Sequence, residues 1–283
     1  MPLVAEARAE RFIQRVGQLH VYSTEAVFQG DRLAMDLRQR RGVTFEVLAP
    51  EGNLSRRWPR SSRGPCGFQI MAIARTHSRS SRRWLVRSVA TGGRSLLGAC
   101  SILNSMRDGP HTVVTDAGPI PIETLIVAVG AWSHRLASKL GHTVPLETQR
   151  GYHALLPDPN VAPRWNVQRS ERKLNATPME TGLRFAGTVE LACLDAPPNY
   201  RRADKLLEQA REMFSGLVGG EISRWMGHRP CLPDSMPVIG PSTHVKKTFF
   251  AFGHGYIGLT CAATTGRLIA DLVTGQKPCV DRF

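Results

Sequence analysis

The stretch TFFAFGHGYIGLT at residues 248–260 decides the fold of this chain. Its first five residues are apolar or β-prone and predict a strand over Thr248–Phe252. Glycines at 253, 255 and 258 then lead into a predicted helix that ends near Thr274, with Gly275 at its C-cap position. Glycines so placed bring backbone N–H groups and a helix N-terminus close to a flat or anionic ligand. A tight turn without a ligand explains them as well.

The same stretch matches the pattern G-x-G-x-x-G, but it lacks the context of a dinucleotide-binding fingerprint. That fingerprint needs a further strand with an acidic residue about twenty positions on. Only 25 residues follow Gly258, and the acid near that distance, Asp271, falls inside the predicted helix. We therefore expect a ligand contact here that differs from an ADP site.

Patterns elsewhere indicate a mixture of helices and strands. The apolar run Thr124–Val129 predicts a strand buried on both faces, followed by a helix through Leu140. Alternation over residues 151–196 predicts an antiparallel sheet, and residues 201–217 predict an amphipathic helix. The remaining predictions are strands at Gln18–Tyr22 and Val43–Leu48, a helix at Asp31–Arg41 ending at Gly42, and a hairpin of Thr112–Thr115 with Pro119–Ile122.

One arginine lies in an unusual setting. Arg229 precedes Pro230, so its backbone is held extended, and the segment Gly227–Gly240 is rich in proline and nearly free of charge. A lone guanidinium there suits a two-pronged clamp on a carboxylate. A surface ion pair is the alternative.

Composition limits the class of protein. The chain has 283 residues, 42% of them hydrophobic, which is enough for a sizeable core. It contains no apolar run long enough for a transmembrane helix, and its N-terminus lacks the apolar region of a secretory signal. Six cysteines without a C-x-x-C pair argue against a zinc site and fit reduced thiols in the cytoplasm.

The net charge of +14 is concentrated in one segment. Residues 51–110 hold eleven arginines, no lysine and two acids, which leaves +5 for the rest of the chain. Three interpretations remain open: a solvated basic linker, an RNA-binding tail, or a segment translated out of frame. Read one nucleotide earlier, codons for residues 67–72 would encode an aliphatic residue or Phe, then Pro or Ser, Asp or Asn, Asn, Tyr or His, and Gly. That is the composition of a strand followed by a turn.

Four segments, in this order and spacing, resemble FAD-dependent oxidoreductases of the D-amino-acid oxidase superfamily, and most of all the bacterial D-amino-acid dehydrogenase (small subunit) type. They are Val127–Ser133, Glu147–His153, Gly227–Gly240 and Phe252–Thr260. The resemblance covers more than half of the chain. It implies an α/β (α+β) fold, with a partial FAD-binding Rossmann-like domain and an antiparallel-sheet substrate domain.

The resemblance also implies a cofactor, a reaction and a set of site residues. The cofactor is FAD, and the reaction is oxidative deamination of D-amino acids, with a hydride passing from the substrate Cα to the flavin and on to a quinone or other acceptor. Positioning would suffice, so no catalytic base and no metal ligand are assigned. The residues implied at the cofactor are Gly130, Ala131, Trp132, Gly253, His254, Gly255, Ile257, Gly258, Leu259 and Thr260. Arg229 would bind the substrate carboxylate, with Arg150, Tyr152, His153 and Tyr256 around it.

Two departures from the family pattern shape our expectations. The family's ADP-binding strand, glycine turn and helix have no counterpart before residue 60, so we expect an N-terminally truncated protein with weakened FAD binding and doubtful activity. Relatives carry a strand and a Pro-Asp-Asn-Gly-like turn near residues 68–73, which favours two frameshifts flanking residues 51–110. A non-enzymatic remnant or a basic nucleic-acid-binding protein is the alternative. Aromatic residues are not interleaved with the arginines, so no specific nucleic acid is expected.

We expect five parts along the chain and a cytoplasmic location, peripheral on the inner membrane. The parts are a substrate-domain fragment at 1–50, a frame-shifted and disordered or loosely packed segment at 51–110, an FAD-domain portion at 111–150, the substrate-binding domain at 151–226, and a C-terminal FAD-domain portion at 227–283.

Overall fold

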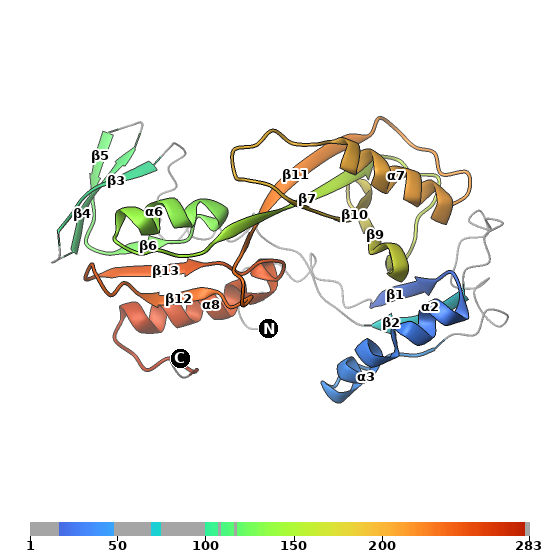
Figure 1. The fold of residues 1–283 in the computed structure, drawn as a ribbon, viewed down its shortest axis with the longest axis horizontal. Helices are drawn as coiled ribbons and strands as arrows, with labels where there is room; N and C mark the ends of the chain where they lie inside the picture. The colour runs from blue at the N-terminus through green and yellow to red at the C-terminus, as the bar shows by residue number, and fades with distance from the viewer. Residues whose placement is uncertain (1–16, 48–68, 75–99, 107–108, 116–117, 281–283) are drawn as a thin grey trace.

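Two long strands, β7 (Glu147–Leu156) and β11 (Ser223–Cys231), connect two lobes in this computed structural model (Figure 1). The structure describes residues 17–47, 69–74, 100–106, 109–115 and 118–280. Both strands belong to a seven-stranded sheet, the large sheet, in which they pair antiparallel. A second lobe is built on a three-stranded sheet, the small sheet.

The large sheet has the order β11-β7-β10-β9-β8-β1-β2, and all its pairs are antiparallel except β1 with β8. Its other strands are β10 (Gly182–Leu191), β9 (Leu174–Met179), β8 (Asn166–Arg169), β1 (Gln18–Tyr22) and β2 (Gln69–Ala74). The predicted antiparallel sheet is confirmed, with one parallel pair added by β1. A short 3₁₀ helix, η4 (Ser170–Arg172), links β8 to β9.

Helix α7 (Arg201–Met213) covers one face of the large sheet (Figure 1). Its buried stripe packs into an apolar core whose fully buried members include Leu174 and Phe185. The predicted helix over residues 201–217 is four residues too long, because Phe214 is extended and Gly216 has a φ of +73°. Leu217 is nevertheless buried in the same core.

Helices α2 (Glu25–Gly30) and α3 (Arg32–Arg40) follow β1. Gly42 lies just beyond α3 with a φ of +78°, as expected of a residue that ends a helix. The prediction of a strand at Val43–Leu48 is wrong for residues 43–47, which are irregular. The described edge of β1 that such a strand could pair with is occupied by β2, and Phe45 packs instead against the small cluster around Tyr22.

The small sheet has the order β12-β13-β6, from β12 (Val238–Pro241), β13 (Thr248–Phe252) and β6 (Leu125–Val127). Helices α6 (Ser133–Lys139) and α8 (Gly258–Val273) lie on opposite sides of it (Figure 1). The strand at 248–252 and the helix that follows are confirmed, and Gly275 has a φ of +71° just past the end of α8.

The strand predicted at Thr124–Val129 is shorter than expected and is not buried on both faces. Only Leu125–Val127 is strand, and Ile126 is 46% exposed. Among the described residues β6 is one of the two edge strands of the small sheet, and no strand pairs with its outer edge.

A third sheet is a meander of β3 (Cys100–Met106), β4 (Gly109–Thr115) and β5 (Gly118–Pro121). Its β4–β5 pair confirms the predicted hairpin. Within residues 51–110, β2 pairs with β1 and β3 pairs with β4, so those two stretches form strands, while the expected loose packing of the segment stays a prediction. All eleven arginines of this segment lie outside the described residues.

The boundaries expected at 150/151 and 226/227 both fall inside strands. The first lies within β7 and the second within β11. Arg150 and Arg229 are therefore both held in the regular geometry of the large sheet, which agrees with the extended backbone expected for Arg229 before Pro230.

Candidate substrate and flavin site

The register of β7 and β11 decides which side chains share a surface. Arg229 is the partner of Gln149, and Gly227 is the partner of Gly151. Because successive residues of a strand point to opposite faces, these four lie on one face of the large sheet. Arg150 and Tyr152 lie on the other face, which α7 covers.

Arg229 is half-buried and held in place by weak partners. Its Nη1 donates to the carbonyl oxygen of Thr188 at 3.5 Å, and its guanidinium lies 4.8 Å from the centre of the Tyr256 ring. A cation over an aromatic face is attracted by the ring's negative face. Among the described residues no acid forms a salt bridge with Arg229, so its charge is free to bind a carboxylate.

The glycine turn at residues 253–258 lies directly beside this arginine. Gly253 and Gly255 have φ angles of +88° and +54°, and the Gly255 N–H donates to the carbonyl oxygen of Pro230 at 2.8 Å. A Cβ at Gly253 would lie 2.7 Å from the Leu232 side chain. The hydroxyl of Tyr256 donates to Oε1 of Gln149. These contacts fix the N-terminus of α8 against the ends of β7 and β11.

The N-terminus of α8 is open to a ligand. Ile257 stands at the N-cap position and offers no side-chain hydrogen bond to the first turn of the helix. Exposed side chains surround it: Tyr256 is 60% exposed, Ile257 55% and Leu259 53%. The first-turn N–H groups of Gly258, Leu259 and Thr260 thus form the positive end of a helix dipole with apolar side chains around it.

His254 belongs to the turn but its side chain is used within the protein. Its Nε2 lies 2.8 Å from Oγ1 of the buried Thr265, about two turns along α8. Burial lowers the pKa of His254, so the imidazole is neutral at pH 7. We therefore place its role in holding the turn to the helix, and the backbone of residue 254 remains the part available to a cofactor.

The second predicted cofactor segment, Gly130–Trp132, is a short 3₁₀ helix (η3) after β6. Gly130 has a φ of +58°, Ala131 is buried, and Trp132 is 48% exposed. The Trp132 ring meets His228 edge-to-face, with ring centres 5.1 Å apart. His228 lies 2.9 Å from Oγ1 of Thr148, and burial lowers its pKa, helped by the charge of Arg150.

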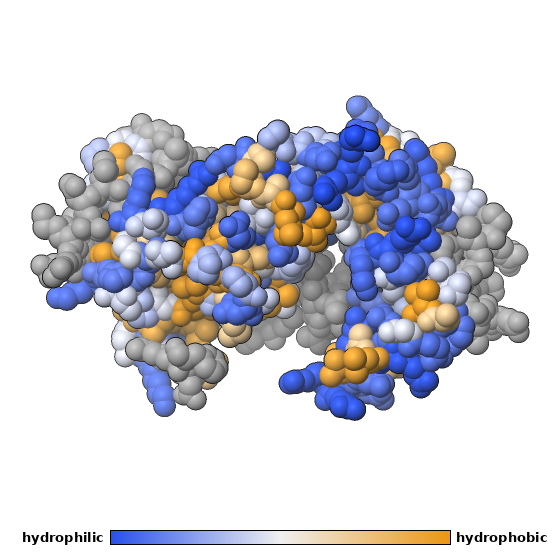
Figure 2. All heavy atoms as spheres, in the orientation of Figure 1, coloured by the Kyte–Doolittle hydropathy of each residue, from blue (hydrophilic) through white to orange (hydrophobic). Residues whose placement is uncertain are grey.

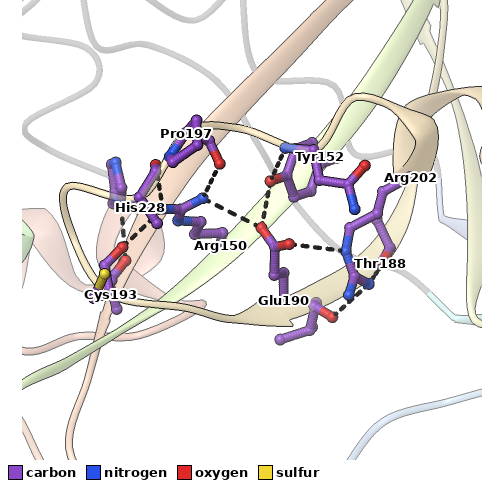
Figure 3. Close-up of polar contacts among 12 residues, drawn as sticks. Arg150, Tyr152, Thr188, Glu190, Cys193, Pro197, Arg202 and His228 are labelled. Atoms are coloured by element: carbon purple, nitrogen blue, oxygen red, sulfur yellow. Dashed lines mark hydrogen bonds and ion pairs between the residues drawn. The ribbon is translucent and has the colours of Figure 1, made fainter.

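Two predicted substrate residues do not join this group. Arg150 is fully buried, and its guanidinium donates to the carbonyl oxygens of Cys193, Ala196 and Pro197 (Figure 3). The hydroxyl of Tyr152 donates to Glu190 and accepts from the Asn199 N–H. Both side chains hold the loop at 192–200 against the large sheet, so neither is free to contact a ligand.

Glu190 is the centre of that network (Figure 3). It lies 3.4 Å from Nη1 of Arg150 and 3.3 Å from Nε of Arg202. The hydrogen bond from Tyr152, together with the charges of Arg202 and Arg150, holds the pKa of Glu190 below its usual range. Arg202 also reaches Oγ1 of Thr188, whose carbonyl receives the Arg229 hydrogen bond.

His153 lies on the same face as Arg229 but further along β7. Its ring is stacked on Trp225, with ring centres 5.0 Å apart and 24° between the planes. Burial, with the nearby charge of Arg184, lowers the pKa of His153. Figure 2 shows apolar atoms at the surface in the middle of the molecule, where β7 and β11 pass between the lobes.

The structure adds residues that sequence reasoning missed. Gln149, Thr188 and Trp225 all contact predicted site residues. For Gln149 a signal existed, because it lies in the segment Glu147–His153 that carries the family resemblance. Thr188 and Trp225 became neighbours of the site only through strand pairing.

The amides at the start of α8 and the glycines before them suit the ring system of a flavin, whereas the described contact of Trp132 is with His228, on the opposite face of the sheet from Arg229. A reduced flavin gathers negative charge on its pyrimidine ring, which a helix N-terminus stabilises. Seven of the ten predicted cofactor residues come from this single turn and helix start. The described geometry thus places a helix N-terminus without a side-chain cap beside an arginine suited to carboxylates.

The chain belongs to the family of FAD dependent oxidoreductases, which matches residues 2–272. A D-amino-acid oxidase of Bradyrhizobium diazoefficiens is 36% identical over an alignment covering 98% of this chain and 67% of the relative. A D-amino acid dehydrogenase of the same species is 29% identical, covering 94% of this chain and 65% of the relative. The chain thus spans about two thirds of the length of these relatives.

Solved structures share the fold. A glycine oxidase from Geobacillus kaustophilus aligns with a TM-score of 0.80 at 19% identity, covering 99% of this chain and 77% of that protein. An iminodiacetate oxidase from Chelativorans sp. BNC1 aligns with a TM-score of 0.82 at 21% identity, covering 99% and 79%. The resemblance and the α/β fold class predicted from the sequence are confirmed.

Proposed function

We propose that this chain supplies the substrate-binding part and the flavin-ring contacts of an oxidoreductase that oxidises D-amino acids. The observation that carries the proposal is Arg229, a half-buried cation that has no salt bridge to a described acid and lies beside the open N-terminus of α8. The names of the two Bradyrhizobium relatives support the substrate class.

The residues of the chain have defined tasks in this proposal. Arg229 binds the substrate carboxylate, Tyr256 and the Thr188 carbonyl hold its guanidinium in place, and Gln149 fixes the Tyr256 hydroxyl. FAD, when bound, supplies the acceptor for the hydride that leaves the substrate Cα. Orientation of the Cα by the carboxylate contact is then the main contribution of the protein.

The final electron acceptor divides the proposal into two versions. Relatives include an oxidase and dehydrogenases, so oxygen and a carrier such as a quinone are both acceptors to test. We favour a quinone or similar carrier as the acceptor, and we propose that the protein acts at the surface of the inner membrane, where such carriers are found. Within the described ranges, no helix is long and apolar enough to cross a membrane. Oxygen consumption compared with reduction of a soluble quinone analogue separates the two.

The test is reduction of flavin by amino acids under anaerobic conditions. The chain mixed with FAD should lose its oxidised flavin absorbance on addition of a D-amino acid and keep it with the L-enantiomer. Arg229→Lys should raise the half-saturating substrate concentration sharply, because a point charge replaces a two-pronged clamp. Arg229→Ala should cost about 2–5 kcal/mol of binding free energy, the scale for truncating one partner of a buried charge pair. An alanine variant that keeps its substrate affinity but loses flavin would show that Arg229 serves the cofactor.

A further inference from the structure

A pair of glycines faces each other at the centre of the surface that carries Arg229. Gly151 on β7 is the direct partner of Gly227 on β11, and Val189 on β10 is the partner of Gly151 on its other side. On the same face of β11, Arg229 lies two residues from Gly227 toward the small lobe. Trp225 lies two residues from Gly227 in the opposite direction. The opposite face of the sheet is covered by α7.

Both glycine positions are filled by side chains of neighbouring residues. A Cβ at Gly151 would lie 2.1 Å from Nη2 of Arg229, and a Cβ at Gly227 would lie 2.0 Å from the outer edge of the Trp225 indole. Opposed Cβ positions on antiparallel strands are about 5 Å apart. The missing side chains thus let a guanidinium and an indole lie flat on the sheet and next to each other.

The surface beside the guanidinium is apolar. The Trp225 indole is 55% exposed and stacks on His153, and Val189 is 42% exposed. His153 is neutral at pH 7 because burial and the charge of Arg184 lower its pKa. A ligand whose carboxylate meets Arg229 therefore has an aromatic ring and an aliphatic side chain next to the carboxylate position.

We infer that the two glycines divide recognition between a carboxylate contact at Arg229 and a side-chain contact at Trp225 and Val189, and that the preferred ligands carry a large apolar or aromatic side chain. The inference rests on the proposed function, in which Arg229 binds a carboxylate. It adds the part of the site that selects among carboxylates: large flat side chains gain contact area on the indole, and small ones leave it exposed to water.

The test measures binding of acetate, phenylacetate and succinate to the chain by calorimetry or ligand-detected NMR. We expect phenylacetate to bind about tenfold more tightly than acetate, since it buries a ring against the indole. Trp225→Ala should reduce phenylacetate to the affinity of acetate and leave acetate unchanged. Succinate binding as tightly as phenylacetate would overturn the inference, because Arg184 would then be attracting a second carboxylate.

Two glycine variants separate the two contacts. Neither Gly151 nor Gly227 has a positive φ, so alanine suits the backbone at both. Gly151→Ala displaces the guanidinium and should weaken acetate and phenylacetate alike, whereas Gly227→Ala displaces the indole and should weaken phenylacetate alone. If both variants change the ratio of the phenylacetate affinity to the acetate affinity by the same factor, the inference is overturned.

Arg229→Gln distinguishes failure of the inference from failure of the proposed function. If the inference and the function both hold, this variant loses both carboxylates. If it loses neither, the carboxylate site is elsewhere and both proposals fall. If it loses both while Trp225→Ala leaves their ratio unchanged, the inference alone falls. Leu33→Ala, on the 72% exposed Leu33 of α3, is the control, and circular dichroism verifies folding of every variant.

Discussion

Arg150 shows how a buried cation can support a site without touching its ligand. Its guanidinium is occupied by the carbonyl oxygens of the loop at 192–200 and by Glu190. We predict that Arg150→Met costs about 2–4 kcal/mol of unfolding free energy in urea, because three loop carbonyl oxygens would lose their donor and Glu190 would keep Arg202 as its remaining cationic partner. If the variant instead keeps its stability and loses carboxylate binding, Arg150 contacts the ligand and this prediction is wrong.

His20 predicts a pH dependence of stability. Burial lowers its pKa from 6.5 to about 4, helped by the charges of Arg38 and Lys173 and opposed by Asp31. The folded state therefore keeps the imidazole neutral, while the unfolded chain takes up a proton below pH 6.5. Stability should be complete above pH 6.5 and fall by about 3 kcal/mol as the pH drops toward 4.

Urea unfolding at a series of pH values checks this prediction. His20→Gln should flatten the fall in unfolding free energy between pH 6.5 and 4, and His244→Gln, at an exposed imidazole, should retain it. If the two variants show the same slope as the parent chain, the pH dependence comes from other groups.

At the scale of the element, the uncapped start of α8 has a structural cost and a proposed use. An acid at the N-cap position would accept hydrogen bonds from the first-turn N–H groups. We predict that Ile257→Asp raises the unfolding free energy by about 0.5–2 kcal/mol and weakens flavin binding, because it occupies those donors and places negative charge there. Unfolding in urea and quenching of flavin fluorescence measure the two effects.

Thr264→Asp adds the same charge to α8 beyond its first turn and serves as the matched control. It should leave flavin binding close to that of the parent chain. Flavin binding that is equal in Ile257→Asp and in the parent would contradict a role for the α8 N-terminus in holding the cofactor.

Single strands could be predicted where the local pattern was enough. Gln18–Tyr22 and Thr248–Phe252 are strands with the predicted bounds, since β-prone residues there are bounded by glycine or polar turns. The strand at residues 43–47 and the burial of Thr124–Val129 were wrong. Both depend on whether another strand lies alongside, and a chain segment does not carry that information by itself.

At the scale of the whole molecule, the two lobes have separate apolar cores. Phe185 is fully buried in the large-sheet core, and Phe250 is buried in the core of the small sheet. We predict that Phe185→Ala costs about 3–5 kcal/mol and that the loss of hydrogen-exchange protection is confined to β8–β10. Phe250→Ala should show the converse pattern, with protection lost in β12 and β13. Equal loss of protection in both lobes for either variant would show that the cores unfold as one unit.

The sequence alone was sufficient to predict the glycine turn, the extended backbone at Arg229 and the apolar helix faces. Each of these features depends on a few neighbouring residues. These features led to the family, which the comparisons confirm. Local patterns singled out Arg229 through Pro230, but they gave no reason to exclude Arg150 from the binding site.

Folding separated these two arginines. The register of β7 with β11 puts Arg229 on the face shared with Gly151, and it puts Arg150 on the face covered by α7. A shift of β11 by one residue would put Arg229 on the same covered face as Arg150. Side-chain direction in a sheet depends on pairing and on what covers each face, so the choice of the binding arginine came from contacts between segments about eighty residues apart.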